Sequence, residues 1–292
     1  MMSSTPSTTA RPAQRLERVR MLRCALAGVE ATIAETTHAF GRHAHEHFGI
    51  GVLLRGGQRS ASGRGPVEAR ASDIITVNPG EVHDGSPLDE RGRSWRMLYF
   101  QPRMLRDAAR EYADAPDSIV ELTQPVANDP LLKARFEHLF TLAVDQTSQV
   151  DALACEEAFV SFIEQVAARH LMLRRPRVVP ASIARARARI DDDPATALSL
   201  AELAGEAGLS RFQLLRSFAR ETGLPPHAYR LQRRVALARR LIAQRMALAD
   251  VAATVGFADQ SHMTRAFVQS FGLTPSRYAE AVRGQADAQG RT

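Results

Sequence analysis

The chain has 292 residues, a length typical of two domains, and its 45% hydrophobic content is that of a globular protein with a sizeable core. No segment approaches the 18 consecutive apolar residues of a membrane span, and the first residues lack the apolar core of a signal peptide. These features exclude an integral membrane protein, and we expect a cytoplasmic one. Cys24 and Cys155 lie far apart and outside any CxxC pattern, which argues against a disulfide.

The formal net charge of +6 is unevenly distributed along the chain. Residues 174–292 contain 19 arginines, no lysine and 10 acidic residues, a net charge of +9, whereas residues 1–173 carry a net charge of −3. A concentration of positive charge in one half is typical of nucleic-acid binding.

The first half of the chain has the pattern of a β-rich domain. Residues 1–20 are rich in Ser, Thr and Pro, and we predict a disordered tail there. From residue 21, apolar runs recur every dozen or so residues, which predicts a β-sandwich or barrel. The predicted strands are Glu30–Thr36, Ile50–Leu54, Asp73–Val77 and Arg96–Phe100.

Two histidine motifs flank these strands. HAHEH (residues 43–47) precedes one strand, and NPGEVH (residues 78–83) follows another. This arrangement resembles the small cupin-like barrel at the N-terminus of many AraC-type regulators, which implies a pocket for a small-molecule effector. Six side chains are candidates for lining such a pocket, although each can instead have a purely structural role: His43, His45, Arg55, His83, Trp95 and Tyr99.

A metal site is the alternative interpretation of the same histidines. His43 and His45 are two residues apart on one predicted strand face, and His83 can supply a third imidazole. The protein would then be a cupin enzyme using Fe or Zn, with a DNA-binding module attached. A catalytic cupin would also supply a carboxylate, but Glu46 lies off that face and residues 48–54 contain none. We therefore expect no metal, no cofactor and no catalytic residue.

Helices are predicted after residue 102, at Arg103–Tyr112, Pro130–Val144 and Asp151–Leu173. The last has an apolar face broader than packing on a small barrel requires. We therefore expect a homodimer, the alternative being intramolecular packing alone. The apolar residues of this face are Leu153, Phe159, Val160, Phe162, Ile163 and Val166.

The domain boundaries follow from composition. We place the barrel and its helices at residues 21–173, and the Pro- and Arg-containing linker at residues 174–181. A helical domain follows at residues 182–283, with Ser182 as the predicted cap of its first helix, and residues 284–292 form a frayed tail.

The helical domain contains one pattern twice. Residues 200–208 align with 248–256, and residues 214–229 align with 263–278. Each copy predicts a helix, a glycine turn and a second helix, which is the helix-turn-helix pattern. Gly208 and Gly256 make the turns, Ser210 and Asp259 cap the second helices, and Gly223 and Gly272 end them.

The second helix of each copy has two distinct faces. Leu214 and Phe218 are predicted to point inward and Arg216 outward, and in the second copy Arg265 points outward. An outward Arg on such a helix can donate two hydrogen bonds to a guanine edge. The alternative is that both arginines are solvated surface residues.

The repeats and their connecting helix, RLQRRVALARRLI (residues 230–242), resemble the DNA-binding domain of the AraC/XylS transcription regulators. The resemblance implies two recognition helices in successive major grooves. Leu215 departs from it, because a polar residue is often found there and an aliphatic one can only touch a thymine methyl or fill space. The implied DNA contacts are Ser210, Arg211, Phe212, Gln213, Leu215, Arg216, Gln260, Ser261, His262, Thr264 and Arg265.

We therefore predict an α+β chain of two domains, a cupin-like barrel with dimerisation helices followed by an all-α tandem helix-turn-helix domain. The predicted function is sequence-specific transcription regulation under a small-molecule effector. The resemblance favours an activator that contacts RNA polymerase. Besides the metal enzyme, a ligand-free regulator whose barrel only dimerises is the remaining alternative.

Overall fold

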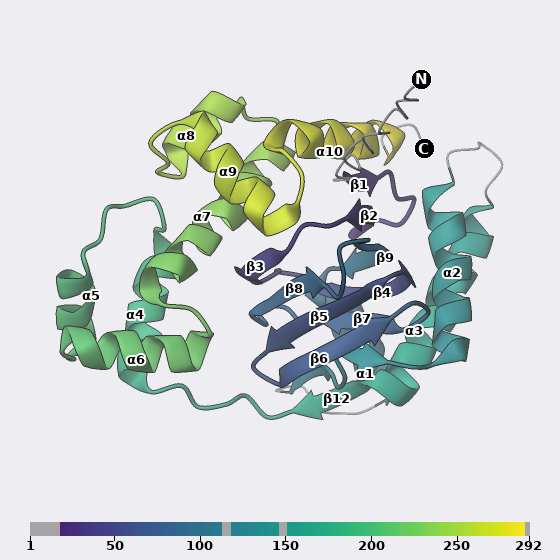
Figure 1. Ribbon diagram of the computed structural model, residues 1–292, viewed down its shortest axis with the longest axis horizontal. Coiled ribbons are helices and arrows are strands. Elements are labelled where there is room, and N and C mark those ends of the chain that lie inside the picture. The colour runs from purple at the N-terminus through teal and green to yellow at the C-terminus, as the bar shows by residue number, and fades with distance from the viewer. Residues whose placement is uncertain (1–17, 113–117, 146–150, 290–292) are drawn as a thin grey trace, which may run out of the picture.

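The computed structural model describes residues 18–112, 118–145 and 151–289, and it has the predicted α+β architecture (Figure 1). Two sheets form the first domain, which corresponds to the predicted barrel and is called the barrel below. The larger has the strand order β1-β2-β9-β4-β7-β11, and the smaller has the order β3-β8-β5-β6. The strands are β1 (Arg18–Leu22), β2 (Val29–Thr36), β3 (Phe40–His43), β4 (Phe48–Arg55), β5 (Gly57–Ser62), β6 (Gly65–Arg70), β7 (Ile74–Val77), β8 (His83–Pro87), β9 (Arg93–Phe100) and β11 (Val126–Ala127).

The four predicted strands correspond to β2, β4, β7 and β9, the apolar centre of the larger sheet. Six residues of β4, Phe48 to Leu53, are buried in succession. The strands β5 and β6 were not predicted, because both are partly exposed and rich in small or polar residues. The strand β1 begins at Arg18, inside the segment predicted as a tail, because it pairs antiparallel with β2.

Three helices pack against the larger sheet: α1 (Pro102–Tyr112), α2 (Pro130–Val144) and α3 (Ala152–His170). Phe100 of β9 stacks on Phe162 of α3, with ring centroids 5.7 Å apart. Helix α3 ends three residues before the predicted Leu173, because Leu171–Arg174 forms a strand, β12, paired with β10 (Ile119–Leu122). Cys24 and Cys155 are both buried free thiols.

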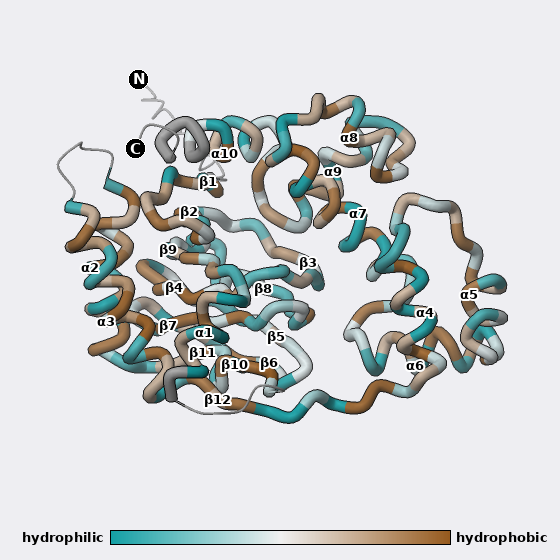
Figure 2. The backbone as a smooth tube through the Cα atoms, turned by 180° about the vertical axis from the view of Figure 1, so that it is seen from behind, coloured by the Kyte–Doolittle hydropathy of each residue, from teal (hydrophilic) through white to brown (hydrophobic). Residues whose placement is uncertain are grey.

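The second domain contains seven helices among its described residues, and an extended segment leads to it from β12 (Figure 2). Helix α4 begins at Ala181, so Ser182 lies inside the helix and the predicted cap is wrong; Pro180 occupies the cap position without a side-chain bond. The helices are α4 (Ala181–Asp192), α5 (Leu200–Ala207), α6 (Arg211–Thr222), α7 (Pro226–Ala243), α8 (Leu248–Thr254), α9 (Gln260–Phe271) and α10 (Pro275–Gln289).

Each helix-turn-helix unit has its own core. Helices α4, α5 and α6 bury Ala186, Leu203 and Phe218 together. The second core, formed by α7 to α10, buries Val251 and Phe267. The long helix α7 joins the two units.

The turns and caps within the repeats are the predicted ones. Gly208 ends α5 in the left-handed region at φ 66°, which a residue with a side chain rarely adopts. Ser210 caps α6 through the backbone N–H of Gln213, and Asp259 caps α9 through that of His262. Helix α10 continues to Gln289, so residues 284–289 are helical rather than frayed.

The second helix-turn-helix unit is docked on the barrel. Val19 and Met21 of β1 pack against its core, and α10 lies across β1 in Figure 1. Gly272, which ends α9 at φ 70°, lies so close to Val19 and Phe40 that an added Cβ would come within 2.7 Å of the Val19 side chain.

No described helix combines the length and the apolar character that a membrane crossing requires.

Candidate effector pocket and DNA-binding surface

A cavity of about 120 Å³ lies where the barrel meets the second helix-turn-helix unit. The barrel supplies one wall, which includes His83, Trp95 and Tyr99. The helical domain supplies another, which includes Arg239 of α7 and Phe271 of α9. Any molecule filling this pocket would therefore contact both domains.

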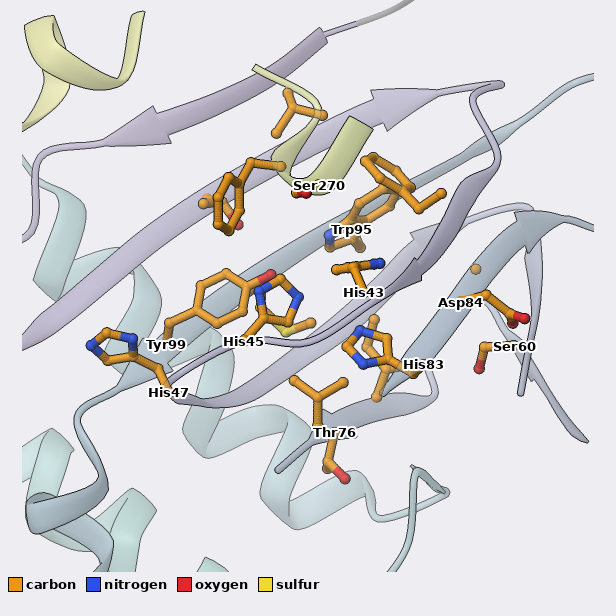
Figure 3. Close-up of a pocket in the computed structure, with 18 of the residues that line it drawn as sticks. His43, His45, His47, Ser60, Thr76, His83, Asp84, Trp95, Tyr99 and Ser270 are labelled. Atoms are coloured by element: carbon orange, nitrogen blue, oxygen red, sulfur yellow. The ribbon is translucent and has the colours of Figure 1, made fainter. Parts of the chain in front are cut away.

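Three histidines gather on the barrel side of the pocket (Figure 3). His43 ends β3 and is the direct antiparallel partner of His83, which begins β8. Their ring centroids are 4.5 Å apart, and that of His45 lies 4.9 Å from His43 and 5.2 Å from His83. His45 lies in the connection after β3 rather than on a strand, so the predicted shared strand face is wrong although the side chains still meet.

Burial keeps these imidazoles neutral. It lowers the pKa of His43 to about 3, and the neighbouring charge of His83 adds to the effect. Burial, followed by repulsion from His43 and His83, holds the pKa of His45 well below its ordinary value. The pKa of His83 is lowered by burial as well. Near neutral pH the cluster therefore presents unprotonated ring nitrogens to the pocket.

An arginine that was not among the predicted pocket residues lies beside the predicted aromatic wall. The guanidinium of Arg93 lies 5.1 Å from the Trp95 ring centroid and donates from Nη2 to the carbonyl oxygen of Gly85 (3.0 Å). Its Nε and Nη1 are buried without a hydrogen-bond partner in the described part of the chain. Burial lowers the pKa of Arg93 to about 10. The one sequence signal for burial of Arg93 is its position at the start of an apolar strand, β9.

Arg239 closes the pocket from the helical domain. Its Nη2 donates to both carboxylate oxygens of Glu30 on β2, at 2.7 and 2.6 Å. Its guanidinium carbon also lies 4.6 Å from the ring centroid of Phe271 and 5.1 Å from that of Tyr278. The ion pair and the two aromatic contacts tie α7, α9 and α10 to the barrel at the edge of the cavity.

The segment that carries His45 is itself bound to α7. The backbone N–H of Ala44 donates to Oε1 of Gln232 (3.2 Å), and Glu46 pairs with Arg233 (3.1 Å) and Arg240 (3.4 Å). A shift of residues 44–47 would therefore be transmitted directly to the helix that joins the two helix-turn-helix units.

Arg55 was predicted to line the pocket, and this prediction is wrong. It lies at the end of β4 outside the cavity, with its side chain 51% exposed and paired with Glu35. A register irregularity between Leu53 and Arg55 in the pairing of β4 with β9 marks this end of the strand. The other five predicted pocket residues all line the cavity: His43, His45, His83, Trp95 and Tyr99.

The outward faces of α6 and α9 are exposed where the repeats place them. Arg211, Arg216 and Arg265 are exposed and form no ion pair with any described residue. Phe212 is 76% exposed and Leu215 is 38% exposed, whereas Leu214 and Phe218 are fully buried. Gln260 and Ser261 are exposed at the start of α9.

Four of the other predicted contacts have local structural partners. Ser210 and Gln213 form a capping box at the start of α6. Thr264 donates its hydroxyl to the carbonyl of Gln260 (2.8 Å), and the half-buried His262 ring packs edge-on against Phe257, with centroids 5.0 Å apart. These four side chains are thus partly occupied in stabilising the helices.

Comparison with known families assigns both halves of the chain. The AraC-like ligand binding domain matches residues 26–163, and a helix-turn-helix domain matches residues 203–281. The chain belongs to the AraC family of transcription regulators. This AraC-family regulator combines a helix-turn-helix DNA-binding domain with an N-terminal ligand-binding domain.

Relatives of the AraC-family chain span most of its length. The HTH-type transcriptional regulator YbfI of Bacillus subtilis is 26% identical over 227 residues, which cover 77% of this chain and 81% of YbfI. The arabinose operon regulatory protein of Escherichia coli is 27% identical over 216 residues, 72% of each chain. An apo form of ToxT from Vibrio cholerae shares the two-domain fold, with a TM-score of 0.57 and 14% identity over 89% of this chain and 100% of that chain.

Proposed function

We propose that this chain is a sequence-specific transcription regulator whose DNA binding is controlled by a small-molecule effector in the pocket between its domains. The observation that carries the proposal is the shared wall of that pocket, where Glu30 of the barrel meets Arg239 of α7. An effector there would change the free energy of docking between the two domains. Control follows only if the effector has different affinities for the docked and released arrangements.

The DNA-reading part of the proposal rests on α6 and α9. Arg216 and Arg265 occupy equivalent exposed positions of the two repeats, and each can donate two hydrogen bonds to O6 and N7 of a guanine. Phe212 and Leu215 are exposed apolar side chains that can contact thymine methyl groups. We therefore place direct base contacts on Arg211, Phe212, Leu215, Arg216, Gln260, Ser261 and Arg265.

The docking of the second unit suggests how control would work. Its core packs on β1, whereas the core of the first unit is built from α4 to α6 and residues next to them. Because α7 joins both units and contacts the pocket, an effector that moves α7 would reorient one recognition helix relative to the other. Simultaneous contact with two successive major grooves requires one particular relative orientation.

The remaining parts of the proposal concern partners and location. Leu153 and Val160 are 60% and 53% exposed on α3, which supports a homodimer through this helix. We further propose that the protein is cytoplasmic, activates transcription by contacting RNA polymerase and has no enzymatic activity. In the described part of the chain, the histidine cluster includes no carboxylate ligand of the kind a catalytic cupin would be expected to supply.

The test is a selection of bound sequences from random DNA, followed by affinity measurements with single variants. Arg216→Ala and Arg265→Ala should each lose roughly 1 to 3 kcal/mol of discrimination at one base pair. Arg220→Ala is the matched control, because Arg220 lies on the same helix but pairs with Glu221. Equal weakening of binding to every sequence would reduce both arginines to phosphate contacts and contradict sequence-specific reading.

A further inference from the structure

We propose that His43, His45 and His83 form a binding site for one divalent transition-metal ion of the zinc type, with its fourth coordination position open to the pocket. One candidate ligand atom from each residue lies within 4.8 Å of the other two. The inference deepens the proposed function, because the ion would lie in the effector pocket. Binding of the ion does not depend on the proposed function; only an effect of the ion on DNA binding would.

The geometry needs little adjustment to bind an ion. Zn–N distances of about 2.0 to 2.1 Å in a tetrahedral site place the nitrogens roughly 3.4 Å apart. The backbones of the three residues are already held in place: His43 and His83 are direct strand partners, and the N–H of Gly80 donates to the carbonyl of His45 (2.7 Å). Rotation of the side chains alone can therefore bring the three nitrogens to this spacing. The backbone thus fixes all three residues around one point.

Two of the rings are already held in a tautomer that leaves Nε2 free to coordinate a metal. Nδ1 of His43 lies 2.7 Å from the carbonyl oxygen of Gly41, and Nδ1 of His83 lies 3.0 Å from that of Glu81. A carbonyl oxygen can only accept, so each Nδ1 carries the proton and donates it. The lone pair is then on Nε2, and such a backbone acceptor is the usual second partner of a metal-binding histidine.

The nearby carboxylates are occupied elsewhere, which selects the class of ion. Glu81 pairs with Arg64 and accepts from the side-chain amide of Asn78, Asp84 accepts from the backbone N–H of Ala61, and Glu30 is bound to Arg239. Three neutral imidazoles without a carboxylate suit Zn²⁺, Cu²⁺ or Ni²⁺, whereas Mg²⁺ and Ca²⁺ prefer oxygen ligands.

The test is a titration of Zn²⁺ into chelator-treated, tag-free full-length protein against a competing chromophoric chelator, without DNA. We expect one ion per chain. His45→Gln and His83→Gln should each weaken binding by at least about 100-fold, since loss of even an outer partner costs 10- to 100-fold. His47→Gln is the matched control, because His47 lines the same pocket but lies outside the three-residue cluster. It should leave the affinity unchanged.

A second readout does not depend on the folding of any variant. Co²⁺ added to the wild-type chain should give the visible absorption of a four-coordinate nitrogen site, and Zn²⁺ should displace it. Absence of competitive zinc binding by the wild type, or binding that survives both His45→Gln and His83→Gln, would overturn the metal site. Neither result would contradict the proposed function. That function is contradicted by a different result, namely that no ligand of the pocket changes the affinity for the operator.

Discussion

Arg239 of α7, the helix that joins the two helix-turn-helix units, donates to both carboxylate oxygens of Glu30 on the barrel, although the two residues are 209 positions apart in the chain. The side chains are only 12% and 23% exposed. Because water screens this pair poorly, its attraction is stronger than that of a surface ion pair. It joins the barrel wall of the pocket to the DNA-binding domain.

Glu30→Gln should weaken the docking of the DNA-binding domain on the barrel. The variant leaves the guanidinium without its counter-charge, and we expect the free energy of unfolding to fall by about 2 kcal/mol, less than the 3 to 5 kcal/mol of a fully buried pair. Glu35→Gln breaks the exposed pair with Arg55 and should cost at most about 1 kcal/mol. Denaturant unfolding and hydrogen exchange of α7 amides measure both. Equal effects of the two substitutions would show that the interface does not depend on Glu30.

Two neighbouring leucines distinguish the buried face of α6 from its exposed face, where we propose that DNA bases are contacted. Leu214→Ala removes a fully buried side chain from the core of the first unit and should destabilise it by about 2 to 5 kcal/mol. Leu215→Ala should change stability by no more than about 0.5 kcal/mol. It should nevertheless alter preference at one base pair. A stability loss of similar size for both variants would mean that the helix is rotated from the orientation described above.

Asp129 makes the barrel domain sensitive to acid. Burial raises the pKa of this carboxyl, but hydrogen bonds from the N–H of Leu132, from His170 and from Gln165 outweigh it and lower the pKa to about 2. The folded pKa is therefore below the unfolded value of 3.8, so this contribution is present above pH 3.8 and is lost as pH falls towards 2.

The expected contribution of Asp129 is at most about 2 kcal/mol. Asp129→Asn keeps a good helix cap but removes the charge. The difference in unfolding free energy between wild type and this variant should therefore shrink as pH is lowered from 5 to about 2.5. Asp107→Asn, which removes a carboxylate on a side chain that is 66% exposed, is measured alongside as the surface control. A constant difference for Asp129→Asn across this range would contradict the assignment.

A fragment of residues 174–292 should fold and bind DNA as a monomer. Both helix-turn-helix cores are built mainly from its own residues, although it loses the contacts of Val19 and Met21. Its net charge of +9 predicts an affinity that falls steeply with salt. Circular dichroism and sedimentation test the fold and the monomeric state. An unfolded fragment would argue against the division into two independent domains.

Local patterns explain what the sequence predicted well. The caps Ser210 and Asp259 and the helix end at Gly272 follow rules that operate over a few residues, so the repeats were predicted almost residue by residue. The pairing of Arg239 with Glu30 has no local signature, because it depends on how two separately patterned domains dock. The sequence therefore suggested a pocket in the barrel but not its second wall.

The burial of Arg93 could not be predicted for a related reason. An arginine at the start of a strand is usually exposed, and only the folded sheet places this one against the rings of Phe40 and Trp95. Sequence spacing correctly predicted that the His43 and His45 side chains meet, but not that they leave from different elements, since His43 is the last residue of β3 and His45 lies in the connection that follows.

Control of DNA binding through the pocket is tested most directly by the affinity for a selected operator with and without a small molecule that raises the unfolding temperature of the full-length chain. In the wild type, saturating effector should change the operator Kd by about 5- to 150-fold, the usual range of such coupling. The Glu30→Gln variant should bind the same effector with a much smaller change in operator Kd. A compound shown to bind the pocket that leaves the wild-type operator Kd unchanged would contradict control of DNA binding through the shared wall.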